Sequence, residues 1–392
     1  MKKKIYLFLN NKILTLDTVI PLIFDFKKEN RNIEVIFYCF NKSTLDEINK
    51  NLFLLKLINN VGVLKILPSS STIKIIRIFN IFFNLMFLLI TSIFIKNTYI
   101  HFKALELFPF NVLYFTNKKN CFYIDPNPWG YIKNLEKSDD IFFKNKRFKD
   151  ERPQKEIKYT KNIITFSKES PFVERMKKKK KKIFFLNFPR ADKEWLKYCY
   201  KESQFFIKKN FSIKKIKDNK KLVLYLIGHF GAISGFDKNT NGKILFIKTI
   251  IQLKKINDVF IIFKPHPNAN VKEIKRILKN LDFINYKISY MHTAVLASFC
   301  KYTISNYFSF ALPDAWFANS ITIEITKYDK EILSFTKNNS VGEEFVNYFI
   351  DSEDKNKLYE ILSSKKHSLH KTHKKNYKDV SSIDLSKIIY NS

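Results

Sequence analysis

The sequence predicts an α/β protein whose parallel sheets are divided between two domains. Short apolar runs rich in β-branched and aromatic residues alternate with segments of helical periodicity along the chain. The length of 392 residues is sufficient for two hydrophobic cores. Glycine and histidine residues directly follow two of the apolar runs, and ligands of parallel sheets bind where the strands end.

The first half of the chain alternates between strand and helix from its start. Apolar residues of 15–26 recur at helical spacing, with Thr15 or Asp17 as the N-cap. The expected elements are a strand at 5–9, the helix at 15–26, a strand at 33–38, a helix at 45–58, strands at 63–66 and 121–124, and a helix at 191–211. A lysine-rich stretch at 212–220 marks the domain boundary, which we place after residue 215.

The segment Ile78–Ile95 is the most apolar part of the chain. We interpret it first as a buried core helix, with a helix lying in a membrane interface as the alternative. A membrane span is the third reading, because the segment is at the lower limit of the roughly 20 apolar residues that a bilayer requires. Asn80, Asn84, Thr91 and Ser92 weaken the case for a span.

The composition is strongly basic, with a formal net charge of +34. Only 7 glycines accompany 40 phenylalanines, which indicates a bias over the whole chain and not one basic arm. We therefore expect contact with anionic inner-leaflet lipid or phosphorylated substrates, and no nucleic acid partner, since no DNA- or RNA-binding module is evident. The six lysines of 177–182 are interpreted as a solvated loop, with contact to anionic headgroups as the alternative. The 4 cysteines are scattered, which argues against disulfides and zinc sites and favours the cytosol.

Asp125 directly follows the predicted strand 121–124 and opens the loop that ends at Gly130. Two prolines and a glycine make this loop irregular. An aspartate at the carboxyl end of a strand is well placed for catalysis, and it is equally well placed to cap backbone amides. Both interpretations stay open from the sequence.

The second half continues the same alternation. The expected strands are 222–227, 259–263, 283–289, 302–305 and 320–325, and the expected helices are 243–256, 271–281, 292–299, 310–317 and 333–349. A polar, lysine-rich tail with helical stretches covers 351–392. The second domain is therefore expected at 216–350.

Two of these strands end in residues suited to phosphate. The first is followed by Gly228, His229 and Gly231, which predict exposed amides and a helix N-terminus directed at an anion. The loop matches neither dinucleotide-binding nor P-loop patterns. The second strand ends in Lys264-Pro265-His266-Pro267, where two prolines fix the backbone around an imidazole that can donate to a phosphate oxygen. A rigid turn with an exposed histidine is the alternative.

Hydroxyl and carboxyl groups follow the later strands. Ser305, Asn306 and Ser309 can hold a phosphate or cap a helix. Glu324 ends the next strand, where a carboxylate can accept hydrogen bonds from a ribose or serve the structure.

The second half resembles the nucleotide-binding half of GT-B glycosyltransferases that build bacterial surface polysaccharides. The resemblance lies in Lys264–Pro267, in Ser305–Ser309, and in Asp314-Ala315-Trp316 running into Ile321–Thr326. This group includes bacterial sialyltransferases and polysialyltransferases and, more distantly, CDP-glycerol glycerophosphotransferases. The resemblance is best over residues 221–345, and it implies that His266, Ser305 and Ser309 contact the donor phosphate. The acidic-acidic-Gly motif of the sialyltransferases is missing, and Asp125 is the nearest candidate for its base.

The resemblance implies a GT-B-like fold of two facing Rossmann-like domains. It implies a transferase that moves a sugar, such as sialic acid or another nonulosonic acid, from a nucleotide donor to a capsule or lipooligosaccharide acceptor. The CMP-linked donor is a substrate, and neither a cofactor nor a metal is expected. The expected location is the inner membrane, as a peripheral protein. The expected acceptor is a glycan or a glycolipid. CDP-glycerol-type transfer is the enzymatic alternative, and a non-catalytic binding protein for membrane surfaces or nucleic acid is the other.

Overall fold

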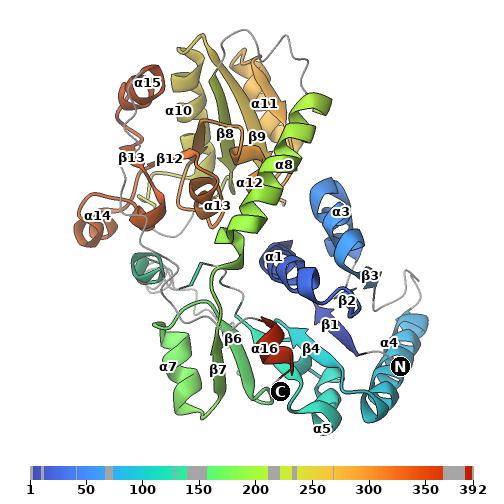
Figure 1. Ribbon diagram of the computed structural model, residues 1–392. Coiled ribbons are helices and arrows are strands. Elements are labelled where there is room, and N and C mark those ends of the chain that lie inside the picture. Colours follow the sequence, from blue (N-terminus) through green and yellow to red (C-terminus); the bar gives the residue numbers. More distant parts are fainter. Residues whose placement is uncertain are drawn as a thin grey trace. The chain divides into compact units, whose positions relative to one another are not determined.

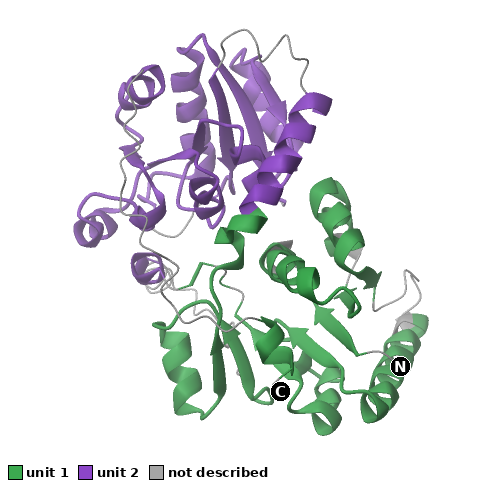
Figure 2. Ribbon diagram, in the orientation of Figure 1, with its two compact units in different colours: residues 1–131, 152–195, 376–392 green, residues 132–151, 196–375 purple. Residues whose placement is uncertain are grey.

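The computed structural model of the protein describes residues 3–9, 13–40, 42–66, 74–125, 127, 129–130, 132–138, 157–210, 221–231, 236–267, 269–364 and 385–390. The chain forms two compact units (Figure 2). The first comprises residues 1–131, 152–195 and 376–392, and the second comprises 132–151 and 196–375. Each unit contains one sheet of parallel strands (Figure 1).

The first unit is built on a sheet of 7 parallel strands in the order β3-β2-β1-β4-β5-β6-β7. The strands are β1 (Lys4–Phe8), β2 (Glu34–Cys39), β3 (Val63–Ile66), β4 (Thr98–His101), β5 (Cys121–Ile124), β6 (Asn162–Thr165) and β7 (Lys182–Phe185). Aromatic side chains of neighbouring strands stack on one face, as the rings of Tyr6 and Tyr99 do at 5.3 Å. Such cross-strand stacking fixes the register of parallel strands that lack hairpin turns.

The helices of this unit connect successive strands, except for the C-terminal helix α16. They are α1 (Ile13–Glu29), α2 (Lys42–Lys50), α3 (Leu52–Val61), α4 (Lys74–Phe94), α5 (Leu113–Asn117), α7 (Pro171–Lys178) and α16 (Leu385–Tyr390), with short 3-10 turns at Ala104–Glu106, Phe110–Val112 and Pro189–Ala191. Helix α8 (Lys193–Asn210) begins in the first unit and continues in the second.

The second unit has a sheet of 6 parallel strands in the order β10-β9-β8-β11-β12-β13. The strands are β8 (Lys221–Ile227), β9 (Val259–Pro265), β10 (Tyr286–Ile288), β11 (Tyr302–Ser305), β12 (Ile321–Thr326) and β13 (Tyr348–Asp351). The chain moves outward from β8 to β10 and then returns to β11 on the other side of β8. The junction between β8 and β11 is therefore the topological switch point, where ligands of open α/β sheets bind.

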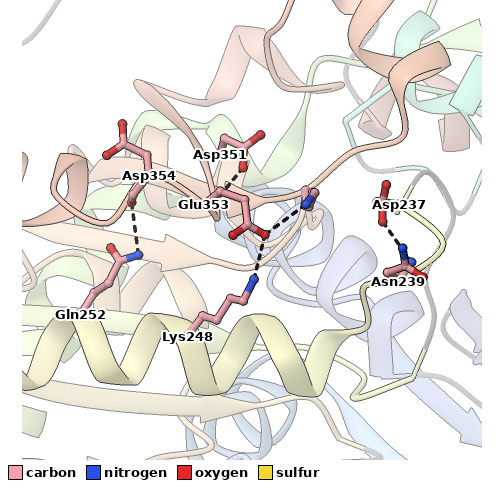
Figure 3. Close-up of polar contacts among 8 residues, drawn as sticks. Asp237, Asn239, Lys248, Gln252, Asp351, Glu353 and Asp354 are labelled. Atoms are coloured by element: carbon pink, nitrogen blue, oxygen red, sulfur yellow. Dashed lines mark hydrogen bonds and ion pairs between the residues drawn. The ribbon is translucent and has the colours of Figure 1, made fainter.

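The helices of the second unit are α10 (Gly242–Lys254), α11 (Val271–Asn280), α12 (Thr293–Ala297), α13 (Leu312–Phe317), α14 (Lys330–Thr336) and α15 (Lys357–Ser363), with a 3-10 turn at Glu343–Phe345. Ion pairs connect α10 to the sheet edge (Figure 3). Glu353, after β13, accepts from Lys248 at 2.8 Å and from Lys327 at 3.1 Å. The hydrogen bond from Lys248 holds the pKa of Glu353 below its usual value. These contacts fix the helix whose first turn adjoins the loop after β8.

The predicted fold class is confirmed, and most predicted elements are present. Three predictions about helices were wrong. Helix α1 begins at Ile13, so Thr15 and Asp17 lie within it and neither is its N-cap. The helix expected at 45–58 is two helices, because the Asn51 side chain accepts from the Leu54 amide and caps a new helix. The region expected to be helical at 333–349 is α14 followed by the turn at Glu343–Phe345 and the edge strand β13.

The unit division differs from the expected domain boundary. The expected linker at 212–220 lies outside the described residues, and the compact units divide after Trp195. The tail expected at 351–392 is divided between the two units, because α15 belongs to the second unit and α16 to the first. The lysine run of 177–182 spans the end of α7 and the start of β7, and most of it is exposed, as expected of a solvated turn.

Candidate functional site

Two histidines meet at the carboxyl ends of β8 and β9. The strands pair in register up to Ile227 and Pro265, and the His266 amide then donates to the Ile227 carbonyl at 2.8 Å, which extends the ladder by one residue. His229 lies two residues beyond the end of β8. The two imidazole rings have centroids 4.2 Å apart. The sequence predicted each histidine separately, and the parallel register brings them together.

The prolines fix the backbone on both sides of His266. Pro265 is buried and is the last residue of β9, while Pro267 is exposed directly after the histidine. A proline ring locks φ, so His266 has little freedom to leave the sheet edge. Lys264 is half-buried within β9 and adds a cation on the same strand. Asn268 lies outside the described residues.

The loop after β8 contains a close approach that requires glycine. A Cβ atom on Gly228 would lie 2.2 Å from the Tyr307 hydroxyl oxygen, whereas one on Gly231 would meet nothing within 4 Å. The His229 amide donates to the Tyr307 hydroxyl. Gly228 therefore brings the loop after β8 against the loop after β11, and Gly231 faces open space. Residues 232–235 lie outside the described part.

The expected helix N-terminus is not free for an anion. The Gly242 amide donates to the Gly231 carbonyl at 3.0 Å, and the Lys243 amide donates to the Phe230 carbonyl at 3.2 Å. The next amide, of Ile244, donates to the Asn241 side chain at 2.9 Å. These bonds saturate the first turn of α10, so the prediction that it presents its amides to an anion was wrong.

The polar residues after β11 are mostly engaged within the unit. Ser305 is buried, and its hydroxyl donates to the Tyr307 carbonyl at 2.7 Å. The buried Asn306 amide donates to Thr249 at 2.9 Å and accepts from the Tyr225 hydroxyl. Ser309 is half-exposed, and its hydroxyl accepts from the Ala311 amide at 3.3 Å. The expectation of phosphate contact fails for Asn306, because its amide bonds the core, whereas Ser309 stays accessible.

Glu324 is a core carboxyl and not a surface ligand. Its side chain is 0% exposed and accepts from the hydroxyls of Tyr328 and Ser340. The Phe308 amide also donates to it. Burial raises the pKa of Glu324 to about 7. The carboxyl therefore anchors the 305–309 loop from beneath, and the expected contact with a ribose is wrong for this buried side chain.

Asp125 lies at the carboxyl end of β5 in the first unit. Its Oδ1 accepts from the Asn127 amide at 3.0 Å, and its Oδ2 accepts from the Thr165 hydroxyl at 3.1 Å. The carboxyl is partly exposed, and its surroundings remove enough water to raise the pKa to about 6, against the opposing effect of both hydrogen bonds. The capping interpretation is thus correct, and the group also has the pKa of a base that is ionised at neutral pH.

The other conspicuous polar groups of the first unit serve its structure. Glu106 accepts from three successive amides, of Lys158, Tyr159 and Thr160, at 2.7 to 2.9 Å. His101 is fully buried beside Thr160, at 3.0 Å, and burial lowers the pKa of its imidazole to about 3. Neither group is placed like Asp125, at an accessible strand end.

Two residues that shape the site have no recognisable signal in the sequence. Tyr307 lies within the predicted 305–309 loop, but nothing in the sequence shows that its ring packs on Gly228. Thr165 ends β6, and only the pairing of β5 with β6 places its hydroxyl on Asp125. Among the described residues, no cluster of three or more His, Cys, Asp or Glu side chains could hold a metal ion.

Several solved structures have a fold similar to that of this chain, at low sequence identity. A protein assigned as a UDP-N-acetylglucosamine 2-epimerase from Listeria monocytogenes has a TM-score of 0.54 and 11% identity, over 93% of this chain and 89% of that one. The S. aureus MnaA–UDP structure has a TM-score of 0.52 and 12% identity, over the same shares, 93% and 89%. No family model and no curated protein matches the sequence. This chain therefore shares a GT-B-like, two-domain Rossmann-like fold.

Proposed function

We propose that this protein is a glycosyltransferase that moves a sugar from a nucleotide carrier to a glycan or glycolipid acceptor. The observation that carries the proposal is the pair of imidazoles of His229 and His266, 4.2 Å apart at the carboxyl ends of β8 and β9. These ends adjoin the topological switch point of the second sheet, which is where nucleotides bind in open α/β sheets.

The second unit is proposed to bind the donor through side chains. Imidazole N–H groups of His229 and His266 would donate to the phosphate oxygens, and Lys264 would contribute a positive charge. Ser309 is the accessible hydroxyl of the neighbouring loop. Since the amides of α10 are engaged, these side chains have to supply most of the electrostatic stabilisation.

The reaction is proposed to be a displacement at the anomeric carbon. The bond between this carbon and the phosphate oxygen breaks, and a bond to the acceptor oxygen forms. Asp125 accepts the proton of the acceptor hydroxyl, and His266 stabilises or protonates the departing phosphate. A carboxyl with a pKa of about 6 is suited to this role, because it is ionised at pH 7 and still sufficiently basic. No metal ion is part of the proposal.

The donor proposed first is a CMP-linked nonulosonic acid, because the Lys264–Pro267 motif resembles that of bacterial sialyltransferases. UDP is the comparison nucleotide, since the S. aureus MnaA structure contains UDP. The acceptor is proposed to be a capsule or lipooligosaccharide glycan. CDP-glycerol-type transfer uses the same phosphate contacts and is therefore tested in the same experiment.

A thermal-shift screen with CMP, CDP, UDP and GDP tests the donor site. At 100 times its dissociation constant a nucleotide adds about 2.7 kcal/mol to the free energy of unfolding. The wild type should melt several degrees higher with one nucleotide than with inorganic phosphate, which controls for unspecific binding to a basic protein. H266A should lose this increment while its melting temperature without ligand stays close to that of the wild type.

Turnover assays with CMP-sialic acid, CDP-glycerol and UDP-sugars then separate binding from chemistry. D125N should retain the nucleotide increment and lose turnover by about 100-fold or more. Wild-type turnover should also fall as the pH drops below about 6, because the Asp125 base becomes protonated. Full turnover by H266A would refute the mechanism. If the protein converts a UDP-sugar without any acceptor, its reaction is epimerisation or hydrolysis and not transfer.

A further inference from the structure

Helix α4 exposes apolar side chains where an ordinary surface helix exposes polar ones. Every described side chain of this helix that is exposed is apolar: Ile75, Ile76, Ile78, Phe79, Phe82, Phe83, Met86, Phe87, Ile90, Ile93 and Phe94. The interpretation of this segment as a buried core helix was therefore wrong. Surface helices normally present polar residues to water, and this helix presents isoleucine and phenylalanine.

Several polar residues of α4 bond their own helix. The Thr91 hydroxyl donates to the Phe87 carbonyl at 2.8 Å, and the Ser92 hydroxyl donates to the Leu89 carbonyl at 2.7 Å. Leu85 and Leu88 pack into the core of the first unit. The helix is thus attached on one side, and Thr91 and Ser92 are hydrogen-bonded within it and buried.

Two further exposed phenylalanines lie in the chain that follows α4. Helix α5 packs beside α4, and the Ser92 hydroxyl bonds the Thr116 hydroxyl at 2.9 Å. The adjacent Phe115 is 86% exposed, and Phe108, just before the turn at Phe110–Val112, is 84% exposed. Together with α4 they expose on the order of 1,000 Å² of apolar surface, above the few hundred Å² usual for a monomer.

The stretch of sequence that contains α4 is positively charged. Residues 48–105 contain no aspartate or glutamate and seven basic residues: Lys50, Lys56, Lys65, Lys74, Arg77, Lys96 and Lys103. The next acid is Glu106, whose carboxylate is occupied by backbone amides. Beyond it, Lys118 and Lys119 are exposed at the end of α5. An apolar helix face within a basic stretch of sequence that has no acid is complementary to an anionic lipid surface.

We propose that α4, with Phe108 and Phe115, docks this protein on an anionic bilayer as a helix parallel to the membrane plane. No helix in the described part of the chain is long and apolar enough to cross a membrane. One side of α4 packs against the first unit, which leaves the phenylalanine and isoleucine side to enter the acyl boundary. The lysines then contact the lipid phosphates.

Vesicle flotation tests this docking surface. The full chain is mixed with vesicles of phosphatidylcholine alone or with 30% phosphatidylglycerol, a composition chosen as roughly that of an anionic membrane. The wild type should float with the anionic vesicles, less with the zwitterionic ones, and less as salt rises. The double variant F79D/F83D should bind at least about tenfold more weakly, because it places two charges in the acyl boundary.

A variant with one added charge in the other unit serves as a control. Ile284 lies in the second unit and is 83% exposed, comparable to Phe79 at 66% and Phe83 at 70%. I284D should bind vesicles within about twofold of the wild type. F83W gives a direct readout, because its emission should shift to the blue on anionic vesicles.

Three results would overturn the proposal. The first is wild-type protein that does not float with anionic vesicles. The second is equal loss of binding in F79D/F83D and I284D. The third is a stable dimer by light scattering that F79D/F83D converts to a monomer, because a second copy would then be the occupant of α4. Circular dichroism of each variant establishes that it is folded.

Discussion

Glu324 shows how burial changes the role of a carboxyl that the sequence places at a strand end. Its residue type and position suggested a ligand for a ribose. The structure gives it three internal donors, namely Tyr328, Ser340 and the Phe308 amide. Residue types and spacing indicate where a strand ends, but whether a side chain points into the core depends on which neighbours the fold supplies.

The pKa of Glu324 leads to a prediction for stability. The folded-state pKa of about 7 lies above the unfolded value of 4.5, so the folded state retains the proton more tightly. The contribution to the free energy of unfolding is present in full below pH 4.5 and is lost as the pH rises to about 7. E324Q cannot ionise at this position and should not lose this stability. The difference in free energy of unfolding between E324Q and the wild type should therefore grow across this window by at most roughly 3 kcal/mol.

Urea unfolding of both proteins between pH 4 and pH 8 measures this difference. The gap between the two curves should widen with pH and then level off. Parallel curves would show that Glu324 is not responsible for any pH dependence of stability.

At the level of elements, the sequence predicts only part of the structure of the loop after β8. The strand, its terminal glycines and the following helix are evident from the sequence, because apolar runs and turn residues are local signals. The saturation of the α10 amides and the contact between Gly228 and Tyr307 are not local. They depend on how β11 pairs with β8, and a single sequence does not state that register.

Two glycines of this loop form a matched pair for mutation. G228A places a methyl group 2.2 Å from the Tyr307 hydroxyl and should lower the free energy of unfolding by about 1 to 3 kcal/mol. It should also weaken nucleotide binding, because the His229 loop has to move. G231A meets nothing within 4 Å and should stay within about 0.5 kcal/mol of the wild type. Equal stability of the two variants in chemical denaturation would contradict this description of the loop.

At the level of the whole molecule, the fold class follows from the sequence more completely than the surface does. Alternating strand and helix patterns predicted both parallel sheets, since the central strands bury continuous apolar runs. The same hydrophobicity led to the wrong interpretation of α4, because composition alone does not distinguish a helix covered by protein from one whose apolar side is left exposed.

The net charge of +34 leads to a prediction for the whole chain. Like charges repel more strongly in the compact state than in the extended chain, and this repulsion lowers stability at low ionic strength. Sodium chloride shortens the screening distance to about 10 Å at 0.1 M. The melting temperature should therefore rise by roughly several degrees between 0.02 and 0.3 M salt. A melting temperature that stays constant or falls with salt would show that repulsion among the positive charges does not lower the stability.

The closed first turn of α10 also has a consequence for how an anion would be released. Backbone dipoles attract phosphate equally at every pH, but at this sheet edge they are already bonded to Phe230 and Gly231. An anion held there by His229 and His266 is held by side chains, which can rotate away without a change in the backbone. Release of a spent carrier would then require no opening of the first turn of α10.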